Sequence, residues 1–123
     1  MFNNRATSGK HMICDIKEIK NLELLNSIKD LSSMLTNICV KYNFEVLQEI
    51  SYEFTPQGCS ILFLLSESHI SIHTFPEKNH MSLDLYTCRE YKDNKEYQEI
   101  YDFLIETLRA STESSLQIID RFF

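Results

Sequence analysis

Four apolar runs separated by short connections dominate residues 44–88 and constrain the fold more than any other feature of the chain. The run at 44–54 alternates apolar and polar residues apart from Gln48, as a half-buried strand does. The run at 61–65 is continuously apolar, which is typical of a central strand. Because the connections are too short for a crossover helix, we expect antiparallel pairing in this region. The four expected strands are residues 44–54, 61–65, 69–75 and 81–88.

Two amphipathic segments accompany these strands. Apolar residues recur every three or four positions over 21–42, which predicts one helix with a buried face. A second helix follows Asp93 or Asn94, either of which can cap it. Its expected buried stripe is Tyr97, Ile100, Tyr101, Leu104 and Leu108. Residues 11–16 and 116–122 predict a first and a last strand, and residues 1–8 are expected to be loose.

These elements predict a single domain, residues 1–123, of the α/β (α+β) class. We expect a two-layer sandwich in which two helices cover one face of a mostly antiparallel sheet. The chain has 12 basic and 18 acidic residues without a basic stripe, so nucleic acid is not an expected partner. It has no apolar run of the roughly 18 residues that a membrane span needs, and no signal-peptide pattern at its start.

The four cysteines are Cys14, Cys39, Cys59 and Cys88, and their spacing matches no zinc motif. We expect reduced thiols in a cytoplasmic protein, with all but Cys88 in or near the core.

The segment Ser66-Glu67-Ser68-His69-Ile70-Ser71-Ile72-His73-Thr74-Phe75-Pro76-Glu77 holds the candidate chemistry. The Ser68 hydroxyl can attack the carbonyl of Glu67 and convert that peptide bond to an ester. Removal of the Ser68 α-proton then eliminates the upstream chain as a carboxylate. The remaining dehydroalanine tautomerises to an imine, and water hydrolyses this imine with loss of ammonia, which leaves a pyruvoyl group at a new N-terminus. His73 is the candidate base because a histidine can accept a proton near neutral pH.

The segment resembles the prokaryotic S-adenosylmethionine decarboxylase proenzyme family. The matching residues are Gly9-Lys10-His11 with Asp15, the stretch 54–60, the stretch 66–77, and Asp84-Leu85-Tyr86-Thr87-Cys88. The resemblance implies the same two-layer fold and self-cleavage between Glu67 and Ser68, giving a β chain (1–67) and an α chain (68–123). It also implies a homodimer of cleaved protomers that decarboxylates S-adenosylmethionine for spermidine synthesis, with sites at or near the interface.

The same resemblance implies roles for individual residues. His73 acts in processing with help from Ser60. The pyruvoyl cofactor, made from Ser68, forms a Schiff base with the substrate and acts as an electron sink. Cys88 then returns a proton to the substrate α-carbon. Aromatic rings suit the adenine and the sulfonium, and carboxylates suit the ribose hydroxyls and positive charge. The substrate-binding candidates are Phe54, Phe75, Glu77 and Asp15.

One geometric requirement follows from the spacing of Ser68 and His73. They are five positions apart, and an odd spacing on one uninterrupted strand places two side chains on opposite faces. If they are to meet, the chain must bend or break between Ser66 and His69. We therefore expect a strained connection there.

Several departures from the family pattern keep other functions open. Phe75 stands where Trp is common, Lys78-Asn79-His80 where Tyr-Gly-Tyr is common, and Arg89 where Gly is common. These changes leave room for ornithine or arginine as the substrate of a pyruvoyl-dependent decarboxylase. Two further alternatives are a non-catalytic partner subunit and a metal-binding protein. The metal would be held by His11, His69, His73 and His80.

Overall fold

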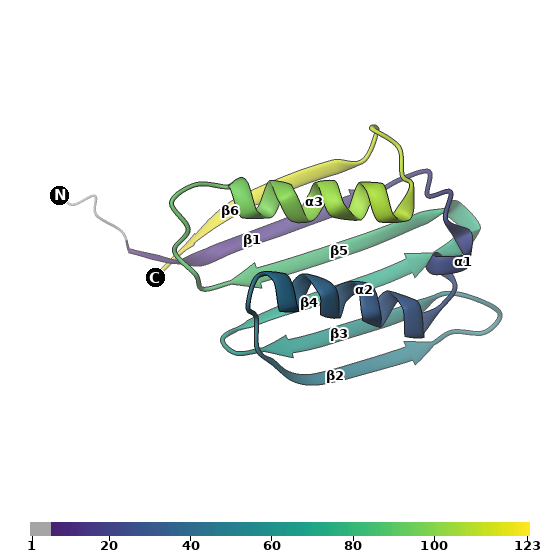
Figure 1. Cartoon of the computed structure of the whole chain (residues 1–123), viewed down its shortest axis with the longest axis horizontal. Coiled ribbons are helices and arrows are strands. Elements are labelled where there is room, and N and C mark those ends of the chain that lie inside the picture. Colours follow the sequence, from purple (N-terminus) through teal and green to yellow (C-terminus); the bar gives the residue numbers. More distant parts are fainter. Residues whose placement is uncertain (1–5) are drawn as a thin grey trace.

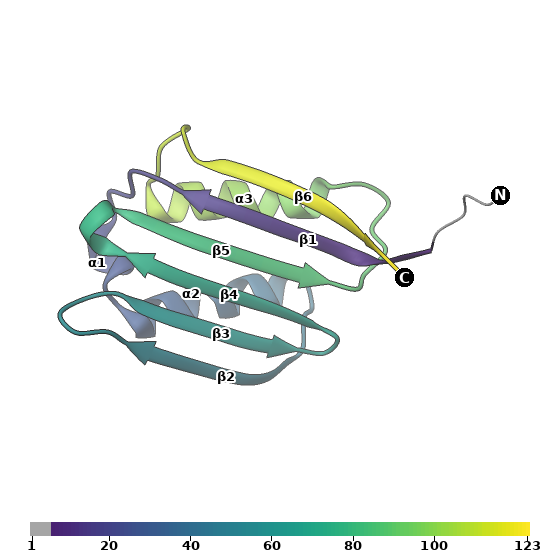
Figure 2. The same cartoon turned by 180° about the vertical axis from the view of Figure 1, so that it is seen from behind.

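A computed structural model describes residues 6–123. Figures 1 and 2 show a six-stranded sheet in the order β2-β3-β4-β5-β1-β6, in which all neighbours pair antiparallel and the helices cover one face only. The expected two-layer α+β architecture is therefore confirmed. The strands are β1 (Thr7–Ile16), β2 (Val46–Glu53), β3 (Cys59–Leu65), β4 (Ser68–Phe75), β5 (His80–Thr87) and β6 (Ser115–Phe122). The helices are α1 (Leu22–Leu25), α2 (Ile28–Lys41), α3 (Lys95–Leu108) and the short 3-10 helix η1 (Pro76–Lys78).

The core lies between the sheet and the helices. Strand register lines up buried residues in rows across the sheet, such as Phe63, Ile70, Leu85 and Met12 on β3, β4, β5 and β1. Each fully buried apolar side chain of this size stabilises the fold by about 1.5–3 kcal/mol. The helices complete the core with Leu31, Met34, Leu35 and Ile38 of α2 and Ile100, Leu104 and Leu108 of α3.

The prediction of a single helix over 21–42 is wrong for the first third of that range. The chain forms the one-turn helix α1, leaves it at Asn26 and starts α2 at Ile28. Ser27 is the N-cap of α2, and its hydroxyl accepts a hydrogen bond from the Asp30 N–H at 3.1 Å. Ser27 therefore starts a new helix, although the apolar spacing continues through it.

Helix α3 begins and packs as expected. Asn94 is its N-cap residue, and the Asp93 carboxylate accepts from the Lys95 N–H at 2.9 Å. The predicted stripe is buried except for Tyr101, which is half-buried. Tyr97 ends in the core, where its hydroxyl shares a 2.7 Å hydrogen bond with the Thr87 hydroxyl at the end of β5.

Strand β2 is present, but the prediction that it is half-buried is wrong. Every residue of Val46–Glu53 is exposed. The alternating apolar residues Ile50 and Tyr52 pair with Leu62 and Ser60 on the sheet face that no helix covers. At the other end of the chain, Thr7 and Ser8 belong to β1 and are therefore not loose. The expectation for residues 1–5 lies outside the described residues.

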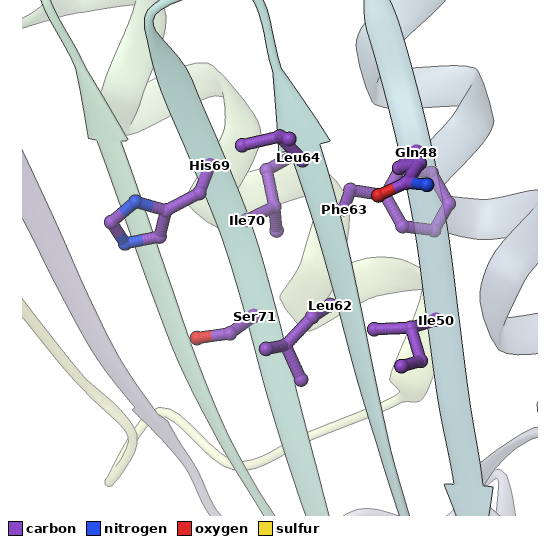
Figure 3. A pocket seen from close by; sticks show the side chains of 8 residues that line it. All are labelled: Gln48, Ile50, Leu62, Phe63, Leu64, His69, Ile70 and Ser71. Carbon is purple, nitrogen blue, oxygen red and sulfur yellow. The ribbon is translucent and has the colours of Figure 1, made fainter.

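The uncovered face of the sheet, called here the open face, is strongly apolar over β2 and β3. Ile50, Leu62 and Leu64 are 67%, 44% and 51% exposed. They line a shallow hollow with Gln48, His69 and Ser71, and Figure 3 shows them side by side on neighbouring strands. An apolar patch of this kind on a small protein is typical of an interaction surface.

Candidate active site at two ends of strand β4

The first group of candidate residues, called here the turn cluster, is Glu67, Ser68 and Cys88. Ser66 and Glu67 form the tight connection between β3 and β4, since Leu65 already pairs with Ser68. Glu67 has a φ of +58°, a left-handed conformation that costs a non-glycine residue about 1–2 kcal/mol. Ser68 is 7% exposed, and the Cys88 thiol donates to the Glu67 carboxylate at 3.6 Å. Glu67, Ser68 and Cys88 line one hollow, and the proposed scissile bond follows a residue whose backbone is strained.

Two side-chain contacts fix the backbone on either side of Cys88. Thr87 is fully buried and bonded to Tyr97, whose pKa is raised by burial, so that the phenol stays protonated. Arg89 donates to the backbone carbonyls of Tyr42 and Asn43 just past α2. Its guanidinium also lies 4.2 Å from the centre of the Phe44 ring. The sequence marked Arg89 only as a departure from the family pattern, and the structure gives it this anchoring role.

The second group, called here the histidine cluster, is Ser60, His73, Phe54, Phe75 and Glu77, which line one hollow at the opposite end of β4. Ser60 and His73 pair across β3 and β4, and Ser60 Oγ lies 2.7 Å from His73 Nδ1. This hydrogen bond fixes the orientation of the imidazole ring. Two aromatic rings and a carboxylate lie beside it, and these are side chains of the kind that contact an adenosyl compound.

Asp15 reaches the histidine cluster through His80, to which the sequence gave no role in substrate binding. Asp15 pairs with Ser82, which pairs with His73, so the three lie in one row across β1, β5 and β4. The His80 Nε2 atom lies 3.8 Å from Asp15 Oδ1, and its ring centre lies 5.8 Å from that of Phe75. His80 therefore links Asp15 to Phe75. The sequence pointed to His80 in two other ways, as a possible metal ligand and as a replacement for a tyrosine of the family pattern.

Within one chain the two clusters do not meet. The expected break between Ser66 and His69 exists as the turn at Glu67, but it ends before Ser68, and β4 runs without interruption to Phe75. Along β4, Ser68 is buried on the helix side and His73 is exposed on the open face. Five residues of extended strand separate their Cα atoms by roughly 16 Å. The expectation that a bend brings His73 to Ser68 of the same chain is therefore not met.

The three cysteines other than Cys88 lie in the core. Cys14, Cys39 and Cys59 are buried and unpaired, and burial raises the pKa of each thiol, to about 12 for Cys14 and about 11 for Cys39. They occupy the packing positions expected for them. Across residues 6–123, no three His, Cys, Asp or Glu side chains are grouped so that they could hold a metal ion. None of the helices described is long and apolar enough to cross a membrane.

Comparison with known proteins identifies the family. A family profile described as S-adenosylmethionine decarboxylase matches residues 10–122. Similar proteins include the S-adenosylmethionine decarboxylase proenzymes of Brevibacillus brevis (36% identity over 93% of this chain and 83% of the relative) and Bacillus velezensis (31% over 91% and 85%). The S-adenosylmethionine decarboxylase proenzyme 2 of a Bacillus cereus strain is 38% identical over 86% of this chain and 83% of its own length.

A solved structure agrees with these relatives. The crystal structure of the adenosylmethionine decarboxylase from Aquifex aeolicus VF5 superimposes with a TM-score of 0.80 at 26% identity, over 95% of this chain and 92% of that one. The fold, the family profile and the relatives therefore lead to one conclusion: this chain belongs to the S-adenosylmethionine decarboxylase family.

Proposed function

We propose that this protein is a self-processing, pyruvoyl-dependent decarboxylase that converts S-adenosylmethionine to its decarboxylated form, the aminopropyl donor for spermidine synthesis. The observation that carries the proposal is the turn cluster. In a chain of this family, it places a buried serine after a strained residue and next to a thiol. The four unpaired thiols are typical of a reducing compartment, which favours the cytoplasm.

The turn cluster fits a pyruvoyl group made from Ser68. Cleavage after Glu67 would leave residue 68 as the first residue of β4, held in place by its pairing with Leu65. The fold can survive this cleavage because β1, β2 and β3 stay in the β chain and β4, β5 and β6 in the α chain. The pairs β3–β4, β1–β5 and β1–β6 join the two fragments across the sheet.

A homodimer formed through the open face explains how the two clusters act together. The apolar hollow around Leu62 and Leu64 needs a cover, and His73 points from the same face. In a two-fold dimer each surface patch meets its own copy, so residues at one end of β4 can face residues at the other end of the partner's strand. Ser68 itself faces the helices, but the Glu67–Ser68 peptide bond lies at the β3–β4 turn where β4 begins. His73 and Ser60 of one protomer would then act on this bond at the partner's turn.

Each candidate residue has a task in this arrangement. Ser60 holds the His73 ring in position to move a proton during processing. Phe54 and Phe75 bind the adenine and the sulfonium. The carboxylates of Glu77 and Asp15 bind the ribose hydroxyls and the positive charge.

Cys88 acts at the turn cluster. The pyruvoyl carbonyl supplies the electron sink for loss of carbon dioxide. Cys88 supplies a proton to the substrate α-carbon, and the Glu67 carboxylate beside the thiol holds that proton in place before cleavage. Its two anchored neighbours, Thr87 and Arg89, keep the thiol at a constant position.

The substrate is tested by carbon dioxide release from carboxyl-labelled S-adenosylmethionine, ornithine and arginine with the purified protein. We expect release from S-adenosylmethionine alone, as the names of the relatives suggest, and nothing in the comparisons favours the other two. Release only from ornithine or arginine would overturn the substrate. No release from any of the three by cleaved protein would favour the non-catalytic subunit.

A further inference from the structure

Gly9 on β1 lies against the backbone of Thr87 and Cys88, where β5 ends at the turn cluster. An alanine Cβ at this position would lie 1.9 Å from the Thr87 carbonyl oxygen and 2.9 Å from the Cys88 Cα atom. Gly9 also has a φ of +137°, which side-chain-bearing residues rarely adopt. Position 9 therefore requires a glycine both for space and for its backbone conformation.

The end of β5 and the neighbouring part of β1 are tied together, so a side chain between them displaces backbone rather than filling free space. Thr87 is held by its buried hydrogen bond to Tyr97 and pairs with Lys10 on β1. The Tyr86 hydroxyl donates to the Ser8 carbonyl at 2.6 Å and so ties this part of β1 to the same strand. A Cβ at Gly9 would therefore push directly against the backbone that carries Cys88.

We infer that Gly9 is a positioning residue for Cys88: its missing side chain lets β1 pass against residues 87 and 88 and so holds the thiol against the Glu67 carboxylate, next to Ser68 in the chain. The inference rests on the proposed function, in which Cys88 protonates the substrate. To relieve the contact with Thr87, the backbone must move by more than about 1 Å. Misplacement of a catalytic group by about 1 Å can lower a rate by about 100-fold.

Kinetics of the cleaved enzyme test whether Gly9 acts through Cys88. We expect Gly9→Ala to lower kcat about 100-fold with little change in KM. The variant that combines Gly9→Ala with Cys88→Ala should be no slower than Cys88→Ala alone, because the misplaced group is already absent. Ser8→Ala is the matched control, since it changes the adjacent residue and keeps the carbonyl that Tyr86 binds. Losses that multiply in the double variant, or a kcat of Gly9→Ala within threefold of wild type, would overturn the inference.

Thiol labelling tests the same inference without activity. In the uncleaved Ser68→Ala protein, iodoacetamide should modify Cys88 severalfold faster when Gly9→Ala is added, because the thiol loses its contact with Glu67. The buried Cys14 and Cys39 should stay unmodified and so report an intact fold. An unchanged Cys88 rate would overturn the inference. If S-adenosylmethionine were not decarboxylated by the wild type, the proposed function would fail while this measurement still reported on Gly9.

A milder variant decides the matter if Gly9→Ala does not fold. Tyr86→Phe removes the hydrogen bond to the Ser8 carbonyl without adding an atom. We expect it to lower kcat in the wild type and not in the Cys88→Ala background. An equal loss in both backgrounds would show that β1 does not act through the thiol, and the inference would be wrong.

Discussion

Separating Ser68 and His73 onto different protomers tests how the two clusters cooperate. Their Cα atoms lie roughly 16 Å apart on one strand, whereas a processing base must come within about 3 Å of the group it serves. A chain carrying Ser68→Ala has nothing to cleave, and a chain carrying His73→Ala lacks the base. We therefore expect each variant alone to stay whole.

Mixed dimers of the two variants should recover one working site. That site combines Ser68 of the His73→Ala chain with His73 of the Ser68→Ala chain. With equal co-expression and random pairing, half of the dimers are mixed, so about a quarter of all chains should be cleaved. Tags of different mass identify the cleaved chain, which must be the one with His73→Ala. Purified mixed dimers that remain uncut, or His73→Ala homodimers that cleave at the normal rate, would refute the shared site.

Three other outcomes follow from the same geometry. Cys88→Ala should cleave normally while kcat falls about 10²- to 10⁴-fold, and a kcat near wild type in a continuous carbon dioxide assay would remove its role as proton donor. Leu62→Asp puts a charge in the apolar hollow and should convert the dimer to monomers, whereas Val40→Asp on the exposed side of α2 should leave the dimer intact. Light scattering measures the two masses, and identical masses for both variants would place the interface elsewhere. Burial raises the pKa of Cys14 to about 12 from its ordinary 9.0, so its contribution to stability is complete below pH 9 and is lost as the pH rises toward 12. The free energy of unfolding, measured with urea, should therefore fall above pH 9 less steeply in Cys14→Val than in the wild type. Parallel pH profiles of the two unfolding free energies would contradict this.

Local sequence patterns predicted most of the architecture. The strands around Ile61, Ile72 and Leu83 lie where alternation and short connections placed them, because antiparallel hairpins depend on neighbouring residues. The break at Ser27 was missed because a capping hydroxyl can start a new helix without disturbing the apolar spacing. The exposure of β2 was also missed, because alternation at Ile50 shows that one face is apolar and does not show whether another layer covers it.

The site could be predicted only in part from one chain. The motif predicted a helping role for Ser60 with His73 and placed Cys88 at the end of a neighbouring strand, and the structure shows the Ser60–His73 hydrogen bond and Cys88 directly after β5. The odd spacing of Ser68 and His73 was recognised as a geometric conflict. Its expected solution, a bend within the chain, was wrong, because β4 remains regular from its first residue. Gly9 and Arg89 act through backbone contacts that no spacing in the sequence reveals.

Denaturing mass spectrometry of the freshly purified protein tests the central claim most directly. The account predicts two fragments, residues 1–67 and 68–123, the second of which begins with a ketone that reacts with hydroxylamine. An unbroken 14.5 kDa chain that releases carbon dioxide from S-adenosylmethionine at full rate would contradict it.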